Sequence, residues 1–321
     1  MNKKKSSDGV KHFYNTTEFS LVAIIVVLFI ISVVSTDNFA TEYNLTNLLK
    51  QCSIIGVLGI AETFIIITAG IDISVGAITG LSCMVLALLQ SKMGMGVGAS
   101  VLVAVIIGLI CGIYNALIIY NFKVPPMIAT LGSQTIIRGA VKIVSDAKTI
   151  SGLDKDFTVL GTASVWKIPC LAIIWIAIAV LAFLILKYTI FGRNLYVLGS
   201  GEDVARLSGI KVGKMYYMAY GLCGLLCGVA GVMLSARINS AVPTAGQSYE
   251  MDAIAASVIG GASLTGGRGA VTGTILGTIL MVLINNAGTQ FGLNTFVLEI
   301  TSGVLITVAV IIDQMKNTVK K

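Results

Sequence analysis

Long runs of apolar residues, separated by short polar stretches, make up most of the chain after residue 18. A helix needs about 20 apolar residues to cross the roughly 30 Å hydrocarbon core of a bilayer. Two runs are weaker candidates, because 126–145 contains Arg138 and Lys142 and because 251–263 is short. The other eight runs each predict a spanning helix, over 19–36, 52–69, 74–90, 97–120, 168–187, 215–236, 270–289 and 295–312. The pattern predicts an all-α, polytopic integral membrane protein with about ten transmembrane helices, and at least eight.

The polar stretches predict how the chain is oriented. Eight or ten crossings bring both ends of the chain to the same side of the membrane. Lys and Arg accumulate in cytoplasmic loops. With the N-terminus inside, most of the 22 basic residues lie in the segments that become cytoplasmic, which are 1–18, 121–125, 187–214, 264–269 and 313–321. We therefore expect two cytoplasmic termini, with an N-terminal segment 1–18, a single transmembrane domain 19–312 and a C-terminal tail 313–321.

The composition agrees with this class of protein. Of the 321 residues, 56% are hydrophobic and 12% are charged, and the mean hydropathy is +0.92. A soluble domain carries about 25% charged residues. Because the basic residues gather at helix ends, the net charge of +7 indicates an anionic lipid surface as the neighbour and not nucleic acid. The six cysteines lie in apolar runs without accompanying His or carboxylate ligands, so no metal site is predicted.

The sequence lacks the residue constellations that common enzyme classes use. It contains no Gly-x-x-x-x-Gly-Lys-Ser/Thr segment, so we expect no ATP binding through a P-loop of this chain. A nucleophile with its base and a His-Glu-x-x-His zinc site are also missing. The single histidine argues against a proton relay but leaves a sodium-coupled carrier open. These features favour a transport protein over an enzyme.

The polar loop 187–214, on the predicted cytoplasmic side, contains a short helix signal. Ser200 is a suitable N-cap, and Asp203 three residues later is similar to a capping box. Gly209 is a typical residue for ending a helix. The signals predict a helix of about two turns, roughly 12 Å long.

The residues inside this short segment predict two faces. Glu202 and Arg206 are four residues apart and can form an ion pair, while Val204 and Leu207 share an apolar face. An isolated helix this short is marginal in water, so it must pack on something. Two interpretations remain: a connector lying on the membrane surface, or a docking helix for a cytoplasmic partner.

Two glycine-rich segments, 70–76 and 261–267, share a pattern and each precede a long apolar helix. They predict breaks in the membrane helices, which are tolerated only where the backbone is buried in protein or faces water. Two aspartates, Asp72 and Asp252, have an alternative interpretation as caps of the helices that begin beside them. The Asn side chains have an alternative interpretation as hydrogen-bonding groups between helices. The candidate pathway residues are Gly70, Asp72, Ser74, Gly76, Asn115, Glu250, Asp252, Asn285 and Asn286.

Four groups of residues carry a family resemblance. They are Gly70 to Gly76; Pro126 with Ile128 to Gly132, Arg138 and Gly139; Gly192, Arg193, Gly199, Glu202, Ala205, Arg206, Ser208, Gly209 and Ile210; and Pro243 to Gly246 with Tyr249 to Ala256, Gly260, Gly261, Ser263, Leu264, Gly266 and Gly267. In this order and spacing, from about residue 45 onward, the chain resembles the membrane-spanning permease subunits of bacterial ABC sugar importers of the ribose, xylose, allose and galactose group. It departs from the family pattern at Ile73, Leu198, Gly201, Val204 and Met251.

The resemblance implies a set of partners. Two permease subunits, either two copies of this chain or one copy with a paralogous permease, form the pathway. Two ATPase units dock on the cytoplasmic loops, and an extracytoplasmic sugar-binding protein delivers the sugar. ATP and Mg are then bound by the partner ATPase, with no cofactor in this chain. The residues that the resemblance assigns to ATPase coupling, with Leu207 added from the predicted apolar face, are Gly192, Arg193, Gly199, Glu202, Ala205, Arg206, Leu207, Ser208, Gly209 and Ile210.

The expected function follows from this resemblance. It is the import of a monosaccharide, ribose or a similar pentose or hexose, by alternating access across the bacterial inner membrane. The alternative is a stand-alone secondary transporter or channel for a small polar solute, which transports without ATP.

Overall fold

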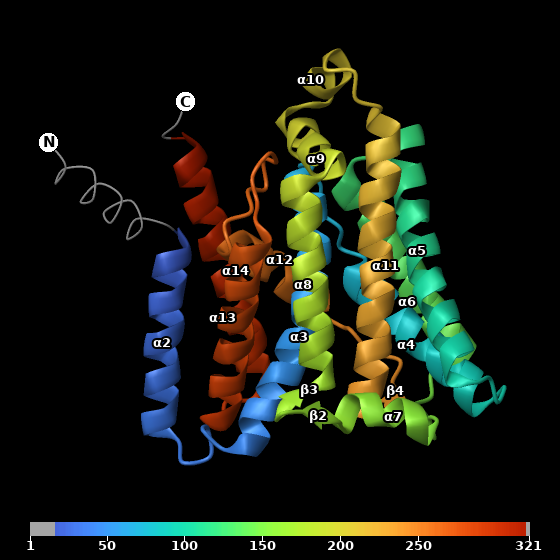
Figure 1. Ribbon diagram of the computed structural model, residues 1–321, viewed down its shortest axis with the longest axis vertical. Coiled ribbons are helices and arrows are strands. Elements are labelled where there is room, and N and C mark those ends of the chain that lie inside the picture. The colour runs from blue at the N-terminus through green and yellow to red at the C-terminus, as the bar shows by residue number, and fades with distance from the viewer. Residues whose placement is uncertain (1–16, 319–321) are drawn as a thin grey trace, which may run out of the picture.

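The computed structural model describes residues 17–318, so most of the predicted segment 1–18 and the end of the predicted tail lie outside the described residues. The described chain forms a helical bundle, and its strands are only two residues long (Figure 1). The helices are α2 (Thr17–Ser35), α3 (Glu42–Ile67), α4 (Val75–Ser91), α5 (Val97–Asn121), α6 (Pro126–Ser145), α7 (Lys155–Thr162), α8 (Cys170–Tyr188), α9 (Ile190–Ser200), α10 (Glu202–Leu207), α11 (Val212–Ile238), α12 (Tyr249–Ile259), α13 (Val271–Gln290) and α14 (Thr295–Thr318). The all-α prediction is confirmed.

Within residues 17–318, seven helices are long and apolar enough to cross a membrane, namely α2, α3, α5, α8, α11, α13 and α14, and α4 is a shorter apolar helix of 17 residues. The predicted count of about ten spanning helices is therefore not confirmed. Helix α6 has 20 residues but is too polar to meet the same standard, since it contains Arg138 and Lys142. Helix α12 has 11 residues, about 16 Å of helix, which is too short for a bilayer.

The chain still passes through the bundle around α12. Strand β4 (Ser240–Ala241) pairs with β1 (Ile150–Ser151) near α7, at the end of the bundle opposite α10 (Figure 1). At the α10 end, the Gly267 amide donates to the Ile67 carbonyl at 2.9 Å. Between these two points the chain uses non-helical backbone and the short α12. Such backbone is tolerated inside a membrane protein because other helices bury it.

Helix α3 forms the centre of the bundle, and its residues from Cys52 to Ile67 are all buried. Close backbone contacts hold the helices around it. Gly108 and Gly112 of α5 lie against Gly224 and Gly228 of α11, where a Cβ atom at Gly112 would overlap the α11 backbone. Small residues at such crossings let helix backbones approach closely in a membrane.

Several element boundaries differ from the predicted ones. Helix α3 begins at Glu42, ten residues before the predicted span 52–69, because Thr41 caps it and the polar Asn44 is buried and bonded to Asn286. Helix α14 continues to Thr318, so the predicted tail is helical as far as it is described.

The segment between α6 and α8, residues 146–169, is also structured. It contains β1, α7 and the hairpin of β2 (Ser164–Val165) and β3 (Ile168–Pro169). In Figure 1 this region lies at one end of the bundle. The first described turn of α2 is at the end of that helix nearer to α10, and the last described turn of α14 also lies on the α10 side.

Candidate functional site

Helices α9 and α10 form an elbow at one end of the bundle. Thr189 caps α9, and its hydroxyl oxygen accepts from the Gly192 amide at 3.1 Å. A Cβ atom at Gly192 would overlap the last carbonyls of α8, so glycine is required for the sharp turn from α8 into α9. The elbow therefore follows directly from the end of a spanning helix.

Two glycines with positive φ bound α10. Gly201 has φ +144° between α9 and α10, and Gly209 has φ +76° after α10. The predicted stop at Gly209 is confirmed. The predicted cap is wrong: Ser200 belongs to α9, its hydroxyl donates to the Tyr196 carbonyl, and α10 has no side-chain cap. Since α9 continues to Ser200, α10 has only six residues, about 9 Å of helix.

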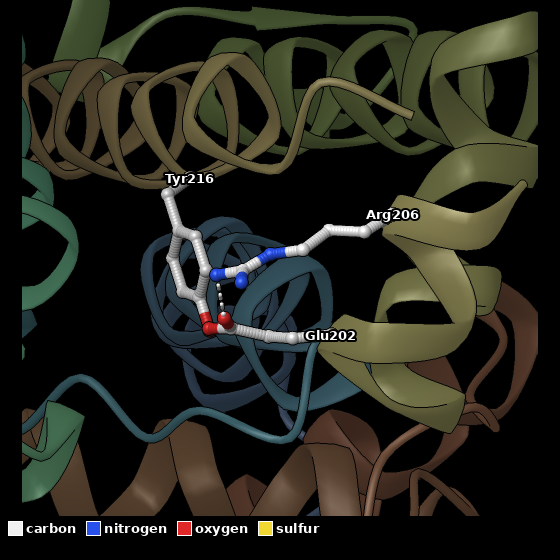
Figure 2. A network of polar contacts seen from close by, with 3 residues as sticks. All are labelled: Glu202, Arg206 and Tyr216. Atoms are coloured by element: carbon white, nitrogen blue, oxygen red, sulfur yellow. Dashed lines mark hydrogen bonds and ion pairs between the residues drawn. The ribbon is translucent and has the colours of Figure 1, made fainter. Parts of the chain in front are cut away.

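A polar network fixes α10 to α11 (Figure 2). Arg206 and Glu202 form the predicted ion pair, with Nη2 and Oε2 3.0 Å apart. The other carboxylate oxygen of Glu202 accepts from the Tyr216 hydroxyl at 2.9 Å. Tyr216 stacks on Tyr220 with ring centroids 6.3 Å apart, and a Cβ at Gly70 would lie 2.7 Å from the Tyr220 hydroxyl oxygen. Contacts thus run from α10 to the loop after α3.

The sides of α10 differ in burial. Ala205 is completely buried, whereas Val204 is 49% exposed and Leu207 is 90% exposed. The predicted apolar face therefore points away from the bundle. Among the other predicted coupling residues, Gly192 and Gly199 are buried, Glu202 and Ile210 are half-buried, and Arg193, Arg206, Ser208 and Gly209 are exposed.

Gly199 joins the elbow to the end of α3 and to the glycine-rich segment 261–267. A Cβ atom at Gly199 would overlap the Ile67 carbonyl oxygen and the Gly267 amide. Tyr196, one turn earlier, donates its hydroxyl to the Gly269 carbonyl at 2.8 Å, and burial raises the pKa of Tyr196 above its ordinary value. A movement of α9 must therefore displace the end of α3 and the loop before α13.

A buried polar cluster around Asp72 holds the break between α3 and α4. The Asp72 carboxylate accepts from the Ser74 amide at 2.9 Å and from the Asn115 side-chain amide at 3.2 Å. The Asp72 backbone amide donates to Glu62 at 3.0 Å. All four residues are completely buried. Asp72 thus stabilises the turn before α4 by bonding to the amide of the N-cap residue Ser74, while α4 itself has no side-chain cap bond. Asn115 of α5 bonds to the same turn.

The predicted pathway residues do not come together in one site. Gly70, Asp72, Ser74 and Asn115 lie around the α3–α4 break, and Gly76 lies against Glu250. Asn286 bonds to Asn44 between α13 and α3, with amide distances of 3.0 and 2.9 Å. Asn285 accepts weakly from Ser302 of α14 at 3.5 Å, and Asp252 lies half-buried in the first turn of α12.

The sequence did not single out several residues of these networks. They are Glu62, Gln134, Tyr216 and Tyr220. Arg138 was noted as a charge in a weak span and as part of the family resemblance, but without a role of its own. Over residues 17–318 no three His, Cys, Asp or Glu side chains are grouped as a metal ion needs.

With this geometry in place, comparisons identify the family. The sequence profile described as the branched-chain amino acid transport system permease component matches residues 44–312. The chain belongs to this permease family. Members of this family are multi-pass permeases of ABC importers and are not catalytic.

Curated relatives match nearly the whole chain. The ribose import permease protein of Bacillus subtilis (strain 168) is 38% identical over 303 residues, covering 92% of both chains. The D-allose transport system permease protein of Escherichia coli (strain K12) is 35% identical, covering 92% of this chain and 90% of that protein. The xylose transport system permease protein of Haemophilus influenzae is 32% identical, covering 91% and 94%. No solved structure matches the chain.

Proposed function

We propose that this chain is the transmembrane permease subunit of an ATP-driven importer and carries a monosaccharide into the cell by alternating access. Family membership supports the importer class, and the relatives named for ribose, D-allose and xylose support a neutral monosaccharide as the cargo. Ribose, or a similar pentose or hexose, is the sugar that we propose. A second copy of the chain, or a paralogous permease, completes the pathway.

The observation that carries the coupling role is the two-sided burial of α10. Ala205 and the Glu202–Tyr216 bond fix one side of the helix to the bundle, while Val204 and Leu207 point outward. An exposed apolar side chain on a fixed helix is a suitable anchor for a groove on a partner protein. We therefore propose that α10 docks into the cytoplasmic ATPase, with the α10 end of the bundle and both chain ends in the cytoplasm.

The contacts of the elbow suggest how ATP turnover moves the pathway. ATP and Mg are bound and hydrolysed by the ATPase, and this chain senses the closure of that partner. A shift of α10 reaches the α3–α4 break through Tyr216 and Tyr220, and reaches the loop before α13 through Gly199. A partner shifts a conformational equilibrium only by binding its two states unequally. The ATPase inside and a sugar-loaded binding protein outside would supply these unequal affinities at the inner membrane.

The test replaces the outward apolar anchor. In the permease assembled with its ATPase, Leu207→Asp places a charge in the proposed contact. A contact residue of this kind contributes about 2 kcal/mol, so we expect about 30-fold weaker binding of the ATPase and a matching loss of ATP-driven sugar uptake. The matched control is Trp166→Asp, because Trp166 is 94% exposed at the opposite end of the bundle.

The control variant should retain ATPase binding. Unchanged ATPase binding by Leu207→Asp would exclude α10 as the docking helix. Sugar transport by the purified permease in vesicles, without ATPase or ATP, would instead favour the stand-alone transporter or channel.

A further inference from the structure

Helix α6 carries a polar face in the middle of its length. Gln134, Thr135 and Arg138 occupy the central part of this 20-residue helix, where Thr135 is exposed and the other two are half-buried. Helix α6 also exposes large apolar side chains, among them Leu131 and Ile136, so its polar residues form a stripe and not a whole face. Helix α8 has no such stripe, because the large exposed side chains in its middle are all apolar: Ile173, Ile176, Val180, Leu181 and Leu184. The α8 surface suits lipid. A charged side chain in the membrane core faces water or protein instead of lipid, because lipid exposure is costly.

The α6 face is continuous with the chain that leads into α12. The Arg138 guanidinium donates to the Ala245 carbonyl at 2.6 Å and to the Gly246 carbonyl at 2.7 Å. The Gln134 amide donates to one Glu250 carboxylate oxygen at 2.8 Å. Further polar groups lie along the same stretch, with Thr244, Gln247 and Ser248 exposed and Asp252 half-buried. Two elements far apart in sequence thus form one polar surface.

Glu250 is held in this surface with an unmet bonding capacity. Its side chain is buried, and its second carboxylate oxygen has no hydrogen-bond partner within the described chain. This oxygen lies against Gly76, where a Cβ atom would overlap it. The adjoining backbone is left-handed, with φ +68° at Gly246 and +65° at the non-glycine Ser248. An unsatisfied buried acceptor beside strained backbone is typical of a functional site.

We propose that this surface, formed by Gln134, Thr135, Arg138, Ser248 and Asp252, is a wall of the water-filled passage and contacts the hydroxyl groups of the sugar. The inference deepens the proposed function and rests on it. Arg138 supplies N–H donors, Asp252 supplies acceptors, and the amide and hydroxyl side chains supply both. A neutral polyhydroxy solute presents both donors and acceptors. The positive charge of Arg138 and the negative charge of Asp252 balance each other, so the wall does not require a charged cargo.

The test measures access of water to this face. Thr135→Cys and Gly139→Cys place thiols on the exposed side of α6, and a Cβ at Gly139 meets no atom within 4 Å. Ile176→Cys on α8 is the matched control, since Ile176 is 53% exposed on an apolar face. Each variant is assembled with the ATPase in proteoliposomes and treated with a charged methanethiosulfonate reagent. The wild type measures the background from its own cysteines, which are buried or half-buried.

We expect both α6 thiols to react about tenfold faster than the α8 thiol, because the reactive thiolate forms in water and not in lipid. Modification should then block ATP-driven uptake, and saturating sugar-loaded binding protein should slow it. Unreactive thiols at both α6 positions, or modification that leaves uptake intact, would overturn the proposed wall. Disulfide cross-linking of two copies without reagent access would show a dry contact and overturn it too. A wild-type complex without ATP-driven uptake would refute the proposed function itself.

Discussion

At the scale of single residues, Gly199 is the position where a small change should have a large effect. The elbow, the end of α3 and the loop before α13 meet there, and any side chain would overlap the Ile67 carbonyl and the Gly267 amide. We expect Gly199→Ala to destabilise the protein by about 1–3 kcal/mol, the usual range for overpacking. The measurement is the temperature at which the purified protein loses its monodisperse peak in size-exclusion chromatography.

The matched control is Gly132→Ala, because a Cβ at Gly132 meets open space on α6. Ala is favoured over Gly inside a helix by up to about 1 kcal/mol, so this variant should be as stable as the wild type or more stable. Equal stability of Gly199→Ala and the wild type would show that the elbow moves freely away from α3.

Residue spacing predicted part of the α10 network and missed the rest. The four-residue separation of Glu202 and Arg206 predicted their ion pair, because such neighbours face each other on any helix. Tyr216 is 14 residues from Glu202, and their bond depends on the angle between α10 and α11. Residue spacing along the sequence does not determine that angle. The cap predicted at Ser200 failed for a related reason, since α9 extends through a loop that looked non-helical.

At the scale of elements, apolar runs predicted where helices lie but not always where they begin or whether they span. Helix α3 begins ten residues early because polar residues in its first turns find partners on α13. Helix α12 ends at Ile259, four residues before the end of the predicted run 251–263, because the chain turns at Gly261, where φ is +96°. Hydropathy measures solubility in lipid, and both exceptions depend on contacts with other protein segments.

The α3–α13 contact gives a second prediction. Asn44 is buried and exchanges two hydrogen bonds with Asn286. Asn44→Ala and Asn286→Ala should each destabilise the protein by about 1 kcal/mol. The double variant should lose less stability than the two single losses added together. The expected difference is about 0.6 kcal/mol and at most about 1.7 kcal/mol, the range measured for polar pairs in membrane proteins.

The control cycle uses Asn285 and Ser302, which are 3.5 Å apart at their closest polar atoms and should show little coupling. Thermal stability of the four purified variants in each cycle is the measurement. Strict additivity for Asn44 and Asn286 would mean that the contact does not hold α13 against α3.

At the scale of the whole molecule, the orientation in the membrane gives the last prediction. Basic segments predicted two cytoplasmic ends, and in Figure 1 both described ends point toward the α10 end of the bundle and away from the β2–β3 hairpin. Leu207 is 90% exposed at the α10 end, and the Lys167 side chain is 83% exposed at the hairpin. We expect a membrane-impermeant thiol reagent to label Lys167→Cys in right-side-out vesicles and Leu207→Cys only in inside-out vesicles.

The wild type supplies the background, since its cysteines are buried or half-buried. In sealed vesicles of one orientation, only one of the two sites should be labelled. Labelling of both sites in the same preparation therefore indicates leaky vesicles. The reverse pattern would place α10 outside the cell, where no ATP-driven partner can reach it. That result would remove the basis of the coupling proposal while leaving the fold and the family unchanged. The labelling pattern therefore decides whether the elbow of α9 and α10 is on the side where ATP is available.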